Sequence, residues 1–178
     1  MAFNVTDVIS NFRFEGARPT LFNINIFNPV DSSSDSTVEF LASAGQVPAS
    51  TLGNIAVPYF GRVINFAGDR TYGTWTVKVM NDENFAIRNA LESWSDAINQ
   101  KVGNVRTQAD YKSTAQVTQF SKTGTPLRIY RFNGIYPSEI APIGLDWAST
   151  NQFETFDVTF TYDYWDITNN TTGNAGGI

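Results

Sequence analysis

The sequence contains no cysteine and no histidine among its 178 residues. Without cysteine the chain can form no disulfide and offers no thiolate nucleophile. Without histidine it lacks the most frequent general base of enzymes, and without either residue it lacks the ligands of ordinary zinc sites. These absences exclude the commonest catalytic and metal-binding arrangements, so we expect no enzymatic activity, no cofactor and no metal site.

Positive charge is also scarce. Lys and Arg number 12 against 17 Asp and Glu, which gives a formal net charge of -5 and a pI near 4.6. A protein that binds tightly along a nucleic acid needs the opposite balance, because its cations must neutralise phosphates. Hydrophobic residues reach 42% and charged residues only 16%, which is typical of a folded chain.

Long apolar runs are missing as well, and the first residues carry no basic flank followed by an apolar stretch. We therefore expect neither a signal peptide nor a membrane anchor. The length fits one domain, which we place at residues 1–167. Residues 168–178 contain mainly Asn, Thr and Gly, and we expect a flexible tail there because so little apolar surface can be buried.

Helical spacing of apolar residues occurs in two places. A short N-terminal helix is predicted within residues 4–14, where Asn4 is a suitable cap. A longer helix is predicted at about 82–99, behind an acidic cap at 81–83, with Arg88 placed to reach Glu92. Its apolar stripe should pack on a sheet and consists of Ile87, Ala90, Leu91, Trp94, Ala97 and Ile98.

Alternation typical of strands fills much of the remaining chain. At 22–26 apolar residues alternate with Asn, and the run 28–36 is rich in turn-forming residues. These features predict a hairpin with a long tip, whose second strand begins near Val38. Further strands are predicted at 75–79, 113–120, 126–133 and 153–165, with a turn at 122–125 and a loop through Pro137 and Pro142.

The strand at 153–165 has two clearly different faces, because successive side chains point to opposite sides of a sheet. Its even-numbered residues from Phe156 to Tyr164 are apolar or aromatic and need to be covered. Its odd-numbered residues form a polar face and are Thr155, Asp157, Thr159, Thr161 and Asp163.

The segment 43–73 is too interrupted by glycine and proline for a long helix, yet it is rich in large apolar residues such as Phe60 and Phe66. We predict a long apolar loop. Because a loop of this kind exposes apolar surface, it needs a cover that the rest of the chain does not obviously provide.

The order of these elements predicts a mainly β (α+β) fold: an antiparallel β-sandwich or rolled sheet with one packed helix. Two other classes of function stay open. Acid pairs such as Asp157 with Asp163 would suit a glycoside hydrolase, although acidic residues on a strand surface are usually only solvent-exposed residues without a catalytic role. Trp147 and Trp165 would suit a carbohydrate-binding module, whereas Trp75 and Trp94 occupy positions expected in a core.

Five longer strings stand out along the chain: RPTLF at 18–22, INFAGDRT at 64–71, WTVKVMNDE at 75–83, GLDW at 144–147 and YDYW at 162–165. Together these strings resemble the tail tube proteins of T-even-like contractile-tailed bacteriophages. The resemblance runs in the same order over about residues 5–166 and departs at 28–36, in parts of 103–126 and in the C-terminal tail.

The resemblance implies a structural protein of the virion, assembled in the host cytoplasm. Six copies would form a ring, and stacked rings would form the hollow inner tube of a contractile tail, through which DNA passes without specific binding. Its partners would be further copies of itself and the sheath, baseplate, tape-measure and tail-terminator proteins. The inner tube of a phage-derived contractile injection or secretion system shares the fold and remains an alternative.

Two surfaces are predicted to matter for assembly. The segment 44–73 should contact a neighbouring ring. Arg62 and Arg70 would pair with acids of another subunit, or Arg70 with Asp69 or another local acid of its own chain. The polar face of 153–165 should face the lumen, with solvent or sheath on the outer wall as the alternative. The candidate interface residues are Pro48, Pro58, Tyr59, Phe60, Arg62, Asp69 and Arg70.

Overall fold

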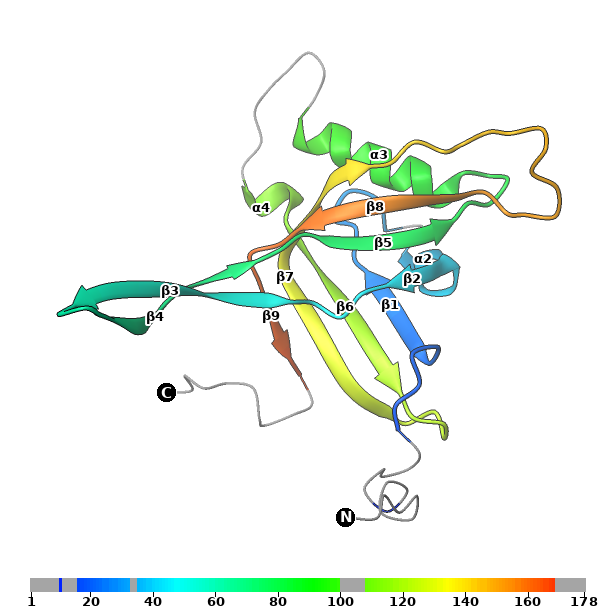
Figure 1. Ribbon diagram of the computed structural model, residues 1–178. Helices are drawn as coiled ribbons and strands as arrows, with labels where there is room; N and C mark the ends of the chain where they lie inside the picture. The colour runs from blue at the N-terminus through cyan, green and yellow to red at the C-terminus, as the bar shows by residue number, and fades with distance from the viewer. Residues whose placement is uncertain (1–9, 11–15, 33–34, 100–107, 169–178) are drawn as a thin grey trace.

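The computed structural model describes residues 10, 16–32, 35–99 and 108–168 (Figure 1). Apart from Ser10, the predicted N-terminal helix therefore lies outside the described residues, as does most of the C-terminal tail. The described elements are β1 (Phe22–Ile26), α2 (Asp35–Leu41), β2 (Ala42–Gly45), β3 (Ser50–Tyr59), β4 (Arg62–Tyr72), β5 (Trp75–Met80), α3 (Ala86–Ile98), α4 (Gln108–Tyr111), β6 (Ser113–Phe120), β7 (Pro126–Ile140), β8 (Thr155–Thr161) and β9 (Tyr164–Ile167).

The main sheet is antiparallel and folds over on itself through the long strand β7. Its order is β1-β6-β7-β8-β5-β2, and β9 also pairs with β7. The first half of β7 pairs with β6 and β9, whereas its last residues pair with β8. Gly134 is the extra residue at the change of register and has a φ of 69°, a conformation that favours glycine.

One core joins the two halves of the sheet and helix α3, which lies over β5 and β8 (Figure 1). Trp75 stacks on Phe132 with ring centroids 4.3 Å apart, and the indole of Trp94 donates a hydrogen bond to the Tyr111 carbonyl at 2.8 Å. Both tryptophans are at most 2% exposed, as predicted. The mainly β, antiparallel fold with one packed helix is thus confirmed.

The helix α3 starts later than predicted. Its apolar stripe is confirmed, with Ile98 at its end only half-buried, and Arg88 pairs with Glu92 at 2.8 Å. The first helical residue, however, is Ala86, because residues 83–84 form a turn and Phe85 adopts a left-handed conformation. Asp82 still acts on the helix start, since its carboxylate accepts a hydrogen bond from the Ala86 amide at 3.1 Å.

The predicted hairpin around residues 28–36 was wrong. The chain instead enters α2, and β1 pairs with β6 while β2 pairs with β5. Val38 and Leu41, three residues apart, contact the core from one side of this helix. The Asn28 side chain ties the segment to the Ala90 carbonyl of α3 at 3.0 Å, so the turn-forming residues lead into a packed helix.

Three other boundaries differ from the predictions. The predicted loop at 43–73 contains the two strands β3 and β4, which pair over nine positions. The predicted loop at Pro137 belongs to β7, where a register shift beside this residue accommodates a proline that cannot donate to the ladder. The predicted strand 153–165 is divided into β8 and β9, which pair with different parts of β7.

Candidate assembly surfaces

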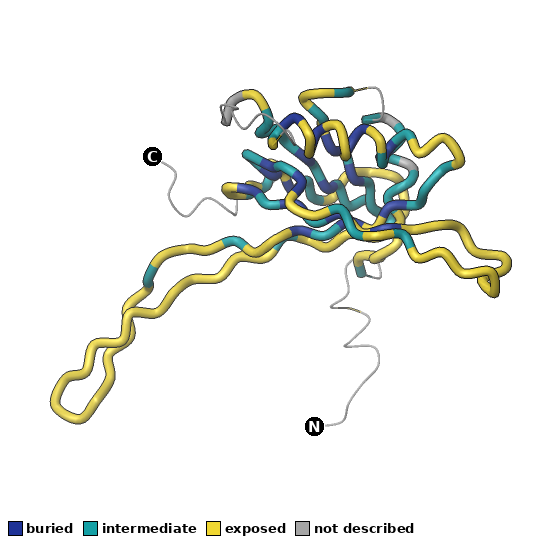
Figure 2. The backbone as a smooth tube through the Cα atoms, turned by 90° about the horizontal axis from the view of Figure 1, so that it is seen from above, coloured by how far each residue is buried: buried dark blue, intermediate teal, exposed yellow. Residues whose placement is uncertain are grey.

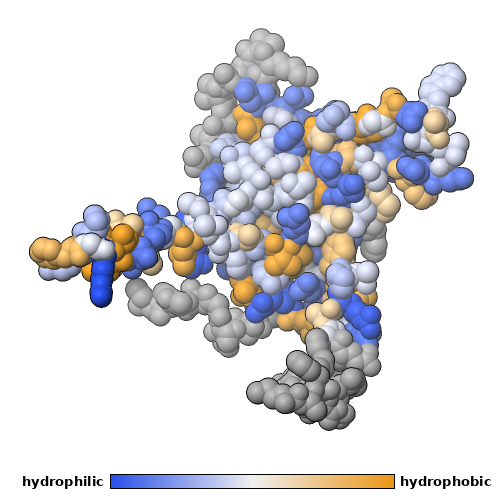
Figure 3. Space-filling view, in the orientation of Figure 1, coloured by the Kyte–Doolittle hydropathy of each residue, from blue (hydrophilic) through white to orange (hydrophobic). Residues whose placement is uncertain are grey.

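The hairpin β3–β4 projects far from the rest of the molecule. Figure 2 shows it exposed along nearly its whole length, and every residue of β3 is exposed. Within the described chain its two strands make extensive contact only with each other. Large apolar side chains are nevertheless concentrated here, as the apolar colouring of the projection in Figure 3 shows.

The pairing register assigns these side chains to one face of the hairpin. Residues directly opposite each other in a ladder share a face, so Ile55 lies beside Phe66. The other face is more polar, since the side chains of Asn54 and Asn65 are hydrogen-bonded at 2.9 Å. We call the first surface the apolar hairpin face; it consists of Ile55, Val57, Tyr59, Arg62, Ile64 and Phe66.

The tip of the hairpin is a two-residue turn. Phe60 and Gly61 both have positive φ angles, 42° and 82°, as tight hairpin turns of this hand require. Gly61 adopts such an angle without strain, but Phe60 does not, and its side chain is 92% exposed. Phe60 therefore combines an exposed aromatic side chain with a strained backbone, which makes it a candidate contact residue.

The base of the hairpin is attached to the sheet by two tryptophans. The indole nitrogen of Trp75 donates to the Gln46 carbonyl at 2.8 Å, and that of Trp165 donates to the Ala49 carbonyl at 3.3 Å. The sequence suggested that Trp165 is free for a surface role. The structure shows instead that this side chain is half-buried and hydrogen-bonded. The two bonds fix residues 46–49, from which the hairpin projects.

The predicted interface residues lie in the hairpin, except Pro48, which precedes it in the fixed segment. Arg62, Asp69 and Arg70 are exposed, and within the described part of the chain none of them has an ion-pair partner. The local Asp69–Arg70 pair is therefore not formed. The sequence reasoning missed Leu52 and Ile55, 57% and 55% exposed, although the alternation at 55, 57 and 59 would have indicated a strand.

The predicted lumen face is only partly continuous. Thr155, Asp157, Thr159 and Thr161 lie on the side of β8 opposite its buried Phe156, Val158 and Phe160. Asp163 instead lies in the bend before β9, where its carboxylate pairs with Lys112 at 2.8 Å and raises the pKa of Lys112 above its usual value.

Strand β5 adds a cation to this surface. Lys78 lies opposite Asp157 in the ladder, and the hydroxyls of Thr76 and Thr159 are 3.4 Å apart. The face therefore carries a positive charge as well as the carboxylate and hydroxyl groups that β8 alone provides.

A second polar sheet face was not recognised in the sequence. It lies on β1, β6, β7 and β9 and carries mainly amides and hydroxyls, with one Arg and one Asp and with Ile129 and Tyr164 in the same register. Within the described residues β1 and β9 each pair on one side only, so both edges of this sheet are open. Alternation of polar and apolar residues within β6 was the signal that could have revealed this face. Its polar residues are Asn23, Asn25, Thr114, Gln116, Thr118, Arg131, Asn133 and Asp166.

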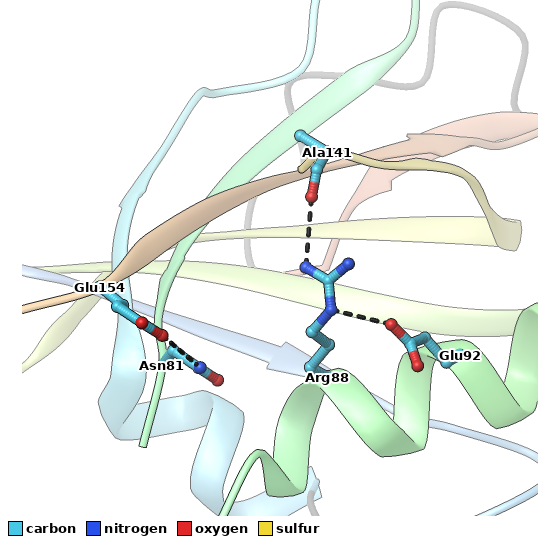
Figure 4. A network of polar contacts seen from close by, with 5 residues as sticks. All are labelled: Asn81, Arg88, Glu92, Ala141 and Glu154. Atoms are coloured by element: carbon cyan, nitrogen blue, oxygen red, sulfur yellow. Dashed lines mark hydrogen bonds and ion pairs between the residues drawn. The ribbon is translucent and has the colours of Figure 1, made fainter. Parts of the chain in front are cut away.

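A second projection, the loop of residues 141–154, lies at the end of the molecule opposite the hairpin (Figure 2). Both of its ends are fixed (Figure 4): Arg88 donates to the Ala141 carbonyl at 3.2 Å, and Asn81 donates to the Glu154 carboxylate at 3.0 Å. Its tip is ordered by Asp146, which accepts a hydrogen bond from the Ala148 amide at 3.0 Å.

This loop exposes three large apolar side chains: Leu145 at 81%, Trp147 at 102% and Phe153 at 83%. The prediction that Trp147 is free for a surface role is confirmed.

No helix in the described part of the chain has the length and apolar character needed to cross a membrane.

Comparison with known proteins identifies the family. The family model described as "Phage tail tube protein" matches residues 10–168. The tail tube protein gp19 of Enterobacteria phage T4 is 36% identical over 154 residues, which cover 84% of this chain and 91% of that protein. The tail tube protein of Serratia phage KSP90 is 26% identical over 136 residues, covering 74% and 76%.

Solved structures support the same fold. The tube-terminating cap structure of the anti-feeding prophage matches with a TM-score of 0.67 at 16% identity, covering 94% of this chain and 99% of that one. The sheath-tube complex of an extracellular contractile injection system matches with a TM-score of 0.61 at 11% identity, covering 94% and 99%. The chain therefore belongs to the phage tail tube protein family, as a relative of the T-even-like tail tube proteins.

Proposed function

We propose that this protein forms hexameric rings that stack into the inner tube of a contractile phage tail, and that DNA leaves the virion through this tube. Family membership supports the tube, and the observation that supports self-assembly is the apolar hairpin face. Ile55 and Phe66 are each 55% exposed there, whereas the alternating apolar residues of β5 and β8 are buried. Surface of this kind marks an interface.

The hairpin contacts the next ring in this proposal. Arg62 and Arg70 lie on it without partners in the described chain and meet acids of a neighbouring subunit. Such pairs lose water on assembly and therefore set which neighbour is accepted more than they add affinity. Baseplate, sheath, tape-measure and terminator proteins would be the other partners, and the tube would assemble in the host cytoplasm.

A polar sheet face lines the channel. The first candidate is the β8 face of Thr155, Asp157, Thr159 and Thr161, which offers no aromatic ring on which a base could stack. The second is the face of β1, β6, β7 and β9, and its two open edges favour it, because sheets of neighbouring copies can join there into a closed wall. In either case the acidic chain repels DNA, so the genome slides instead of binding.

Electron microscopy of the purified protein in negative stain tests the proposal. Rings with sixfold symmetry and hollow tubes are the expected result. A chain that sediments as a monomer and binds glycans would instead support a carbohydrate-binding module. Tubes that hold a protein cargo in place of DNA would support an injection machine, which shares the fold.

A further inference from the structure

The two projections of the chain have complementary surfaces that cannot meet within one copy. The hairpin extends from one end of the molecule and the loop 141–154 from the other (Figure 2). Each carries large exposed apolar side chains, among them Phe66 on the hairpin and Leu145 and Trp147 on the loop. Two different patches at opposite ends allow a head-to-tail contact that repeats from copy to copy.

We propose that the loop 141–154 of one copy docks on the apolar hairpin face of a second copy. Trp147 and Leu145 lie on the row formed by Ile55, Val57, Ile64 and Phe66 in this contact. The inference rests on the proposed tube function. It names the surface of the neighbouring copy that the hairpin contacts, which the family match does not identify.

Charge favours a second copy of this chain as the occupant. The loop carries Asp146 and Glu154 and contains no Lys or Arg between residues 141 and 154. The apolar hairpin face carries one charged residue, Arg62, which has no ion-pair partner in the described chain. Arg62 lies beside the apolar row, and the carboxylates lie on the loop that carries Trp147. Attraction between these opposite charges favours one orientation of the loop on the hairpin face.

Both surfaces are held in place before they meet. The loop is fixed at its ends through Asn81 and Arg88 (Figure 4), and the hairpin base is fixed through Trp75 and Trp165. Preorganisation lowers the entropy that association must offset, so an interface between rigid projections gains more from the same apolar area.

The absence of cysteine makes a direct test clean. Ala148→Cys combined with Ala67→Cys places one thiol beside each surface and keeps Trp147 and Phe66 in place, and a short bifunctional maleimide is added to the assembled protein. Denaturing electrophoresis should show a ladder of covalently linked chains. Each single variant, and the pair Ala148→Cys with Ser93→Cys on the exposed side of α3, should give no ladder.

Substitution provides a second measurement. Leu145→Ala with Trp147→Ala should raise the protein concentration needed for assembly by about tenfold or more, because truncation of a buried tryptophan anchor is costly at interfaces. Thr150→Ala, an exposed polar residue in the same loop, should leave that concentration unchanged.

The results separate this inference from the proposed function. Tubes from the unmodified chain, together with no ladder and normal assembly of the Leu145 and Trp147 variant, would overturn the docking while the tube function stands. A ladder formed equally by the Ser93 pair would also overturn it. Failure of the unmodified chain to assemble would overturn both.

Discussion

Strand β8 and the hairpin β3–β4 show the same alternation of apolar residues but differ in what covers it. On β8, Phe156, Val158 and Phe160 are at most 2% exposed. On the hairpin, Ile55 and Phe66 are each 55% exposed. Burial of such a side chain contributes about 1.5–3 kcal/mol, so β8 is stabilised within the chain and the hairpin face gains this free energy only through a partner. The comparison separates residues that fold the subunit from residues that assemble it.

The largest effect on the free energy of unfolding is expected in the core beside β8. Trp94 is fully buried beneath β8, with its ring 6.4 Å from that of Phe160. Trp94→Ala should lower the free energy of unfolding by about 3–5 kcal/mol, because it leaves a cavity in a close-packed core. Thermal unfolding followed by circular dichroism measures the change.

Trp147→Ala is the matched control, since this tryptophan is fully exposed in the single chain and its loss should not change unfolding. If Trp94→Ala left the melting temperature unaltered, the stripe of α3 would have to face something other than the core.

The second effect should appear in assembly and not in folding. Residues 55–66 can be removed and Asn54 joined to Ala67 by an Asn-Gly turn, because these two residues are paired in the ladder. The shortened chain should unfold at the same temperature as the original but form no tubes in the electron microscope. Tubes of normal length from this variant would show that the hairpin is not needed for stacking.

The fold class could be predicted because most of the body shows local patterns that agree with its packing. Alternation identified β5, β6 and β8, and the stripe ending at Trp94 and Ala97 identified α3. The segment 35–41 was misread because its spacing fits a strand or a short helix equally, and packing against β1 decides between them. The end of β8 could not be predicted, since the switch to β9 depends on which half of β7 is adjacent.

The assembly surfaces were predicted less completely. The exposed apolar content of 43–73 was visible in the sequence, but glycines suggested a loop where a bulge lies. At this bulge Gly53 and Gly68 face each other closely: a Cβ on Gly53 would lie 3.2 Å from the Asp69 carbonyl oxygen. The second polar sheet face is built from four separate segments, so only the pairing of the strands brings it together.

A third, smaller effect distinguishes the two polar sheet faces. Asp157→Lys with Thr159→Lys adds cations to the β8 face, and Gln116→Lys with Thr118→Lys adds them to the face of β1, β6, β7 and β9. The pair that lines the lumen should slow DNA ejection, and added salt should relieve the delay because phosphate contacts release counterions.

The rate of DNA release from virions measures this effect, and tube assembly should be normal for both pairs. The sequence-based prediction is that the β8 pair slows ejection. Normal ejection with weakened sheath attachment for that pair would place β8 on the outer wall, and slow ejection with the β6 pair would place the lumen on the other face.

The smallest effect concerns the link between the two regions. Trp165 lies half-buried in β9, where its ring meets Tyr130 edge-on at 5.8 Å and its indole nitrogen donates to the Ala49 carbonyl at the hairpin base. Trp165→Phe keeps an aromatic ring but removes the donor, which is worth about 0.5–1.5 kcal/mol for an ordinary hydrogen bond.

Unfolding of the single chain should change little, since the hairpin contributes little to the core. Assembly should suffer more, because a hairpin with a looser base loses part of its preorganisation and must be ordered when it binds. The concentration needed for tube formation should therefore rise by a few fold, on the order of the lost bond, while the melting temperature falls by a few degrees at most, at about 2–4 °C per kcal/mol for a chain of this size. Equal loss in both measurements would show that the base of the hairpin belongs to the folding unit.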